Sequence, residues 1–140
     1  MSSIISFFVA PDDEAAATVV DDGPDGTFES VTFGNFDADL ALLEWDSLLT
    51  GRSFDDLLRA SAPGVITDED DGALIVAASV ELQQALARAS AADLESVAQS
   101  WAAERAAEGE PIDPELAGEI LTELGRLSRT AEHRVYCWVS

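Results

Sequence analysis

The chain has 140 residues, of which 28 are acidic and seven are basic, and its formal net charge is −21. This charge excludes nucleic acid and anionic membrane surfaces as expected partners, because phosphate binding requires a basic surface. Hydrophobic residues make up 47% of the sequence, which supports a folded chain that needs no disulfide or structural metal. We therefore predict one globular domain over residues 1–140.

All seven basic residues are arginine, and the sequence has no lysine and many alanines. This usage is typical of a bacterium with a GC-rich genome, and adaptation to high salt is the other interpretation. The excess of acidic residues can keep the protein soluble, or it can attract a basic protein partner. The sequence leaves both roles open.

The apolar stretch Ile4–Ala10 has no lysine or arginine before it, and Pro11 with three acidic residues follows it directly. It matches neither a secretory signal peptide nor a span long enough to cross a bilayer. Cys137 is the one cysteine, which excludes an intrachain disulfide and a cysteine-based zinc site. We therefore expect a cytoplasmic protein that does not bind membranes.

The first part of the chain predicts strand, helix and strand in succession. Residues Ser3–Ala10 are largely apolar on both alternating faces, which is typical of a strand covered on both sides. Pro11 and the acidic residues after it then favour a short helix that runs to about Val20. After the turn residues 21–26, the β-branched and aromatic stretch Thr27–Phe33 predicts a second strand.

The stretch Asp37–Gly51 has the densest apolar content in the sequence. Asp37 can cap a helix and Gly51 can end one. Between them the apolar residues occupy most of the helical circumference, so we predict a buried helix against which other elements pack. Glu44 and Asp46 flank Trp45 in this helix and need water or polar partners.

The rest of the chain predicts mostly helix. Residues 61–72 contain Pro-Gly and an acidic run and predict a loop. Two apolar stretches predict strands, Ala73–Ala78 and His133–Val139. The remaining helices each follow a capping residue, and these residues are Ser53, Ser79, Ser90 and Asp113, the last with Pro114 after it.

The predicted order is strand, helix, strand, two helices, strand, three helices and strand. Strands at both ends with helices between them are typical of an α/β layered fold. We predict a single-domain α/β sandwich in which the helices pack on a small mixed sheet of about four strands.

His133 and Cys137 are residue types that can form a nucleophile–base pair. Their spacing argues against this role, because four residues of one strand separate Cα atoms by about 13 Å. We interpret Cys137 as a small core residue and His133 as a surface or capping residue.

Two acidic loops, Asp21–Asp25 and Asp68–Gly72, invite comparison with calcium-binding loops. In the second loop the glycine comes too early, and Ser79 stands where the last glutamate ligand belongs. The first loop fails similarly, and the sequence contains no phosphate-binding loop, nucleophile elbow or zinc-helix motif. We therefore predict no catalytic residues, no cofactor and no metal site.

Four segments resemble the YfbM-like family of small bacterial domains, for which no activity is established. They are MSSIISFF at the start, WDSLLTG at Trp45–Gly51, the stretch Ala73–Leu94, and the closing helix from Asp113 with the strand RVYCWV. The resemblance covers most of the chain in order and implies an α/β sandwich, not an activity. The family tends to place a basic residue before the tryptophan and a histidine in the turns after it, whereas here Glu44 precedes Trp45 and that histidine is absent.

Two functions of different classes fit the sequence. We favour non-catalytic protein binding, in its sharper form an immunity- or inhibitor-type domain that masks a basic partner. The alternative is a small-ligand-binding domain, or an enzyme of unknown reaction, with a site at the sheet edge near the Trp45 helix. In either case the residues expected to contact the ligand or partner are Glu44, Asp46 and Tyr136.

Overall fold

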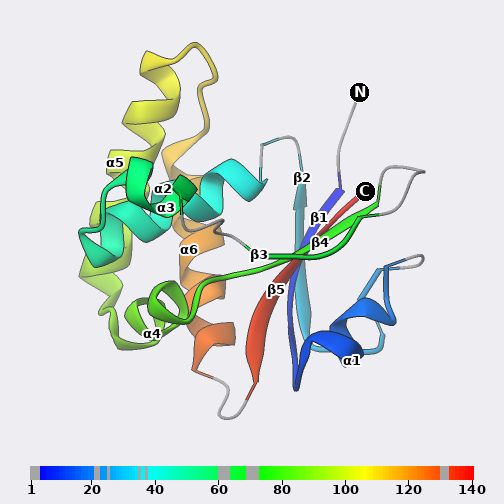
Figure 1. The fold of residues 1–140 in the computed structure, drawn as a ribbon. Helices are drawn as coiled ribbons and strands as arrows, with labels where there is room; N and C mark the ends of the chain where they lie inside the picture. The colour runs from blue at the N-terminus through cyan, green and yellow to red at the C-terminus, as the bar shows by residue number, and fades with distance from the viewer. Residues whose placement is uncertain are drawn as a thin grey trace.

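The computed structural model describes residues 4–20, 23–24, 26–34, 36, 38–59, 64–68, 73–129 and 133–140. Its elements in chain order are β1 (Ile4–Ala10), α1 (Asp13–Ala17), β2 (Ser30–Gly34), α2 (Ala38–Thr50), α3 (Phe54–Arg59), β3 (Gly64–Asp68), β4 (Leu74–Ala77), α4 (Val80–Arg88), α5 (Ala91–Ala107), α6 (Pro114–Ser128) and β5 (Arg134–Val139). Figure 1 shows α2 to α6 on one side of a sheet and α1 on the other. The predicted α/β layered fold is confirmed.

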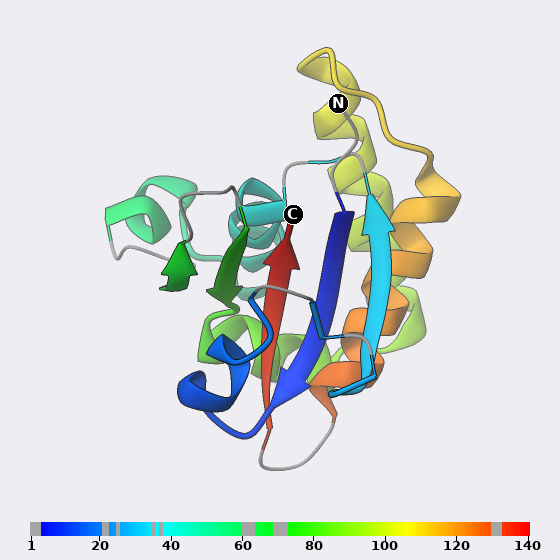
Figure 2. The same cartoon turned by 90° about the vertical axis from the view of Figure 1, so that its right-hand side faces the viewer.

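Within the described residues the sheet has five strands, in the order β2-β1-β5-β4-β3. Every pair of neighbours is antiparallel, so the predicted mixed character of the sheet is wrong. The three helices between β4 and β5 return the chain to the end of the sheet where β4 finishes, since Ala77 pairs with Tyr136. β5 therefore runs against both of its neighbours, β1 and β4 (Figure 2).

The fifth strand, β3, lies in residues that were predicted to form a loop. Residues Val65, Ile66 and Thr67 are β-branched, but Pro63 before them and the acidic run that starts at Asp68 are turn signals. Because these turn signals flank only a few β-branched residues, the sequence pattern of this short strand predicts a loop. β3 pairs with β4 through a register shift between Val65 and Thr67.

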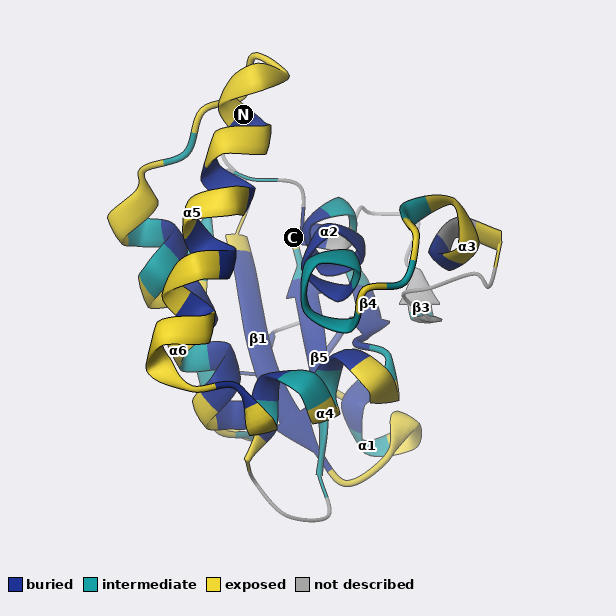
Figure 3. Ribbon diagram, turned by 90° about the vertical axis from the view of Figure 1, so that its left-hand side faces the viewer, coloured by how far each residue is buried: buried dark blue, intermediate teal, exposed yellow. Residues whose placement is uncertain are grey.

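Both faces of β1 are buried, as predicted, and both faces of β5 are buried as well. The face toward α2, α4, α5 and α6 carries the larger core, with strand residues Ile5, Phe7, Val9, Val76, Val135 and Cys137. The face toward α1 carries a smaller core, with strand residues Phe8, Ala10, Ile75, Ala77, Tyr136 and Trp138. Figure 3 shows β1 and β5 buried behind the helices of the larger layer.

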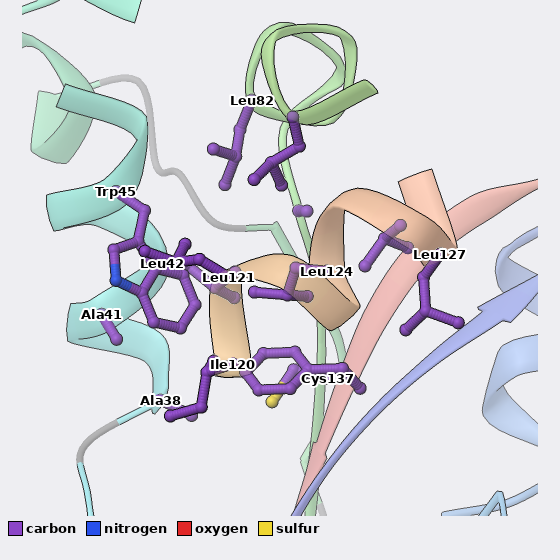
Figure 4. Packing of buried hydrophobic residues seen from close by; sticks show 14 of the residues in the cluster. Ala38, Ala41, Leu42, Trp45, Leu82, Ile120, Leu121, Leu124, Leu127 and Cys137 are labelled. Atoms are coloured by element: carbon purple, nitrogen blue, oxygen red, sulfur yellow. The ribbon is translucent and has the colours of Figure 1, made fainter. Parts of the chain in front are cut away.

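α2 lies in the middle of the larger core, as predicted for a buried helix. The side chain of Trp45 is fully buried, and its ring centroid lies 5.9 Å from that of Phe7 and 5.0 Å from that of Trp101. Figure 4 shows Trp45 and Leu42 pointing from α2 toward α6. The sheet and the helices α4, α5 and α6 thus enclose this helix.

Four predicted capping residues begin their helices, whereas Asp37, predicted to cap α2, lies outside the described residues. Each accepts a hydrogen bond from a main-chain N–H of the first turn, and they are Ser53, Ser79, Ser90 and Asp113. α1 is shorter than predicted and ends at Ala17. The hydroxyl and the N–H of Thr18 both bond to the carbonyl of Ala15, and the chain continues in tighter turns to Val20.

Candidate functional site

The two carboxylates beside Trp45 are buried and point in different directions. Successive residues of an α-helix are rotated by about 100°, so Glu44, Trp45 and Asp46 face three neighbouring regions. Glu44 is 9% exposed and Asp46 is 2% exposed. Each carboxylate therefore needs polar partners within the fold.

Glu44 binds α5. Its two carboxylate oxygens accept hydrogen bonds from Trp101 Nε1 at 3.0 Å and from a terminal nitrogen of Arg105 at 2.8 Å. The side chain of Arg105 is 8% exposed and also binds Glu108 and Glu110 at the surface. Burial raises the pKa of Glu44, and the bonds from Trp101 and Arg105 oppose that rise. Glu44 and Arg105 thus form a buried ion pair that joins α2 to α5.

Asp46 binds the beginning of α4. Both of its carboxylate oxygens lie 2.8 Å from one terminal nitrogen of Arg52, and one of them accepts a hydrogen bond from Ser79 Oγ at 2.6 Å. Ser79 Oγ in turn accepts a hydrogen bond from Leu82 N, which caps α4. Asp46 therefore connects α2 to α4, and both of its carboxylate oxygens have hydrogen-bond partners.

Tyr136 lies on the opposite face of the sheet, beneath α1. Its ring is fully buried and stacks 5.5 Å from the ring of Phe8, and its hydroxyl donates to Asp13 at 2.8 Å. Burial and then the hydrogen bond to Asp13 raise the pKa of the phenol. The structure thus places Glu44, Asp46 and Tyr136 in three separate environments and does not bring them together.

We expect the phenol of Tyr136 to stay un-ionised at alkaline pH as long as the protein is folded. It ionises near pH 10 in an unfolded chain, so its contribution to stability is complete below about pH 10 and is lost as the pH rises further. Tyr136 is the one tyrosine, so phenolate absorbance should appear together with unfolding measured by circular dichroism. Ionisation of the folded protein near pH 10 would contradict this prediction.

The matched control for this titration is Tyr136→Phe. It should lose about 1 kcal/mol of stability at neutral pH with the hydrogen bond to Asp13. Its stability should fall less than that of the wild type as the pH rises above about 10.

A groove of about 520 Å³ lies between α2 and α5 and reaches Phe54 of α3. This α2–α5 groove has apolar walls at Leu40, Leu48 and Phe54. Its polar lining consists of Glu44, Ser47, Glu104, Arg105 and Glu108. Three carboxylates against one guanidinium leave the groove negative. Hydrocarbon walls with excess negative charge suit a long cationic side chain, whose stem is apolar and whose head is charged.

The surface of α5, α6 and their connection, residues 91–128, carries charge mainly of one sign. Nine acidic residues lie in this segment and none is buried; they are Asp93, Glu95, Glu104, Glu108, Glu110, Asp113, Glu115, Glu119 and Glu123. The two arginines of the segment both bind carboxylates, Arg105 in the interior and Arg126 with Glu29 and Glu123. We name residues 91–128 the acidic helix pair, whose outer turns are exposed (Figure 3).

The structure places Cys137 in the core and His133 directly before β5. Cys137 is fully buried in the larger core, and the carbonyl of His133 accepts a hydrogen bond from Gln83 Nε2 at 2.7 Å. Of the two acidic loops, Asp21, Asp22, Asp25 and residues 69–72 lie outside the described residues. The described part of the chain contains no group of three or more side chains placed to hold a metal ion.

Trp101 and Arg105, the partners of Glu44, were not predicted as functional residues. A signal was present, because Arg105 continues the apolar stripe of Leu94, Val97 and Trp101 along α5. A charged residue within an apolar stripe indicates a buried guanidinium that needs a carboxylate. Glu44, inside a helix that is apolar nearly all round, is the matching signal on α2.

Comparisons of the chain with models of protein families, with curated proteins and with solved structures give no match. The resemblance to the YfbM-like family therefore stays a prediction. Within the described ranges, no helix combines the length and the apolar character needed to cross a membrane.

Proposed function

We propose that this protein is a non-catalytic binding domain that holds a basic protein against the acidic helix pair. The observation that carries this proposal is the one-sided charge of residues 91–128, where nine carboxylates accompany two arginines that are already bound to carboxylates. Attraction between surfaces of opposite charge speeds association and disfavours acidic competitors. An immunity- or inhibitor-type domain, which masks the basic cleft of its target, matches this surface.

The α2–α5 groove offers a place to anchor one side chain of the partner. An arginine or lysine can lay its hydrocarbon stem against Leu48 and Phe54 and put its charged head beside Glu104 and Glu108. Long side chains buried in such pockets carry much of the binding energy of protein interfaces. The groove therefore adds specificity to the attraction of the acidic helix pair.

The alternative function, a small-ligand site or an enzyme near the Trp45 helix, draws on the same groove. Its volume of about 520 Å³ is in the range of ligand pockets. However, Glu44 and Arg105 are bound to one another, and Asp46 and Tyr136 face other parts of the fold. The groove therefore supports the anchoring of a basic side chain better than it supports a reaction.

The test is capture of proteins from the lysate of the source organism by the immobilised domain. We expect at least one basic protein to be retained at low salt and released at high salt, because exposed charges are screened by salt. The variant E95Q/E104Q/E115Q, which neutralises three residues of the acidic helix pair, should retain that protein about tenfold less well.

The control is E14Q/D55N/E81Q, which removes the same charge from exposed positions on α1, α3 and α4. It should retain the partner as the wild type does. Equal loss in both variants would show that only net charge matters, and absence of any basic partner would count against the function itself.

A further inference from the structure

β2 is a regular outer strand of the sheet with one side unpaired. It pairs with β1 from Ile4–Gly34 to Phe8–Ser30 without a register shift, and no described segment pairs with its other side (Figure 2). The other outer strand, β3, is interrupted by its register shift. Outer strands of soluble proteins are usually blunted by bulges, charges or proline. The β2 sequence SVTFG has no charge and no proline.

The hydrogen-bond pattern shows which main-chain groups of β2 face outward. Ile4 exchanges both of its main-chain bonds with Ser140 of the β5 side, at 2.9 Å each, whereas Val9 N donates to Glu29 O at 3.2 Å. Since bonding to the two sides alternates along an antiparallel strand, Val31 and Phe33 bond to β1. The N–H and C=O groups of Ser30, Thr32 and Gly34 therefore point away from the sheet.

A second groove, of about 490 Å³, lies beside β2 on the helix face. This β2–α6 groove is lined by Phe33, Gly118, Glu119, Thr122 and Glu123. In a strand added to β2, the side chains opposite Val31 and Phe33 would lie on the same face of the sheet as these two residues. They would therefore enter the β2–α6 groove. Gly118 leaves space there, because nothing lies within 4 Å of the position of a Cβ at this residue.

The charge beside this edge selects a basic occupant. Glu29 and Glu123 share the single guanidinium of Arg126, at 3.1 and 2.7 Å, and Glu119 adds a third carboxylate. A second copy of the chain is a poor occupant, because it would bring two proteins of charge −21 and two such carboxylate clusters together.

We propose that β2 binds an extended, arginine- or lysine-bearing segment of the partner protein by strand addition. Its main-chain groups pair with Ser30, Thr32 and Gly34, and alternate cationic side chains enter the β2–α6 groove. This inference rests on the proposed function for the basic character of the partner. Main-chain pairing supplies affinity in this binding mode, and the groove for alternate side chains supplies specificity.

The probe is a blocked peptide of about eight residues in which arginine and threonine alternate, which puts every arginine on one face of a strand. The control peptide has the same composition with the residues in pairs, so its arginines fall on both faces. Titration calorimetry with the full chain should give an affinity for the alternating peptide about tenfold above that of the control. Equal affinities would overturn the proposal.

Thr32→Pro tests the strand itself, because it removes an outward N–H and no bond between β1 and β2. Proline is tolerated in edge strands when its missing N–H faces solvent. Thr32→Val keeps that N–H and loses the hydroxyl contact with Ser6, which is 2.9 Å in the wild type. The proline variant should bind the alternating peptide about tenfold less tightly than the valine variant. Equal binding by two folded variants would contradict strand addition.

N-methylated peptides give a test that needs no variant protein. Methylation of every threonine should abolish binding in an antiparallel arrangement, and methylation of every arginine should abolish it in a parallel one. Either selective loss supports strand addition, whereas equal effects of the two patterns would overturn it. If neither peptide binds but E95Q/E104Q/E115Q still retains a salt-sensitive partner less well than the wild type, strand addition is refuted and the proposed function is not. The two proposals can be separated in this way because Glu95, Glu104 and Glu115 do not line the β2–α6 groove.

Discussion

Replacing Trp45 with alanine is expected to lower the free energy of unfolding by about 3–5 kcal/mol, because it empties the middle of the larger core. The indole is fully buried, and its ring packs against those of Phe7, Phe36 and Trp101 at centroid distances of 5.9, 6.3 and 5.0 Å. These rings come from β1, from the segment before α2 and from α5. The loss would therefore loosen the sheet and both helices together.

Urea unfolding, followed by circular dichroism, measures this loss. Trp45→Phe is the matched variant, because it keeps an aromatic ring in the cluster and removes an indole N–H that has no hydrogen-bond partner in the described structure. It should lose much less stability than the alanine variant. A loss below about 1 kcal/mol for Trp45→Ala would mean that the core does not depend on this residue.

The second large effect is expected from Arg105→Met, which should cost about 3–5 kcal/mol at neutral pH because it leaves Glu44 buried without its counter-ion. Glu44 would retain the hydrogen bond from Trp101 but not the guanidinium at 2.8 Å. Glu108 and Glu110 lose the same partner, but they are exposed and water can replace it. The cost therefore arises mainly at Glu44.

The pH dependence of this cost is expected to identify Glu44 as its source. Burial raises its pKa in the folded protein, so the stability linked to the protonated carboxyl is present at low pH and is lost as the pH rises through that pKa. As the pH falls, Glu44 becomes neutral and the difference between wild type and Arg105→Met should shrink.

The control introduces Arg105→Met into a Glu44→Gln background. There, urea titrations across the acidic range should show a smaller cost that does not change with pH. A cost that is independent of pH in the wild-type background would show that Glu44 is not the group left unpaired.

Local sequence rules predicted what depends on neighbouring residues. The caps at Ser53, Ser79, Ser90 and Asp113 and the buried helix around Trp45 all follow from residues a few positions apart. The strand β3 was missed, because its β-branched residues are fewer than the turn-forming residues around them.

Contacts between distant segments could not be predicted in the same way. Arg105 lies 61 residues from Glu44, and Ser79 lies 33 residues from Asp46. The sequence predicts that these carboxylates need partners, but the packing of α2 against α5 and α4 decides which partners they have. The direction of β5 likewise depends on where a three-helix connection returns, so the antiparallel sheet could not be derived from strand patterns.

The position of β5 in the sheet has a consequence for biosynthesis. It lies between the β1–β2 pair and the β3–β4 pair, and these two pairs have no contact in the sheet except through it. β5 is also the last of the described elements to be synthesised. Until Arg134–Val139 has emerged from the ribosome, the β1–β2 pair and the β3–β4 pair therefore cannot join into one sheet, and the strand edges of β1 and β4 that β5 covers stay exposed. Folding that depends on pairing between such distant segments is slow, and the apolar surface and strand edges that stay exposed meanwhile favour aggregation.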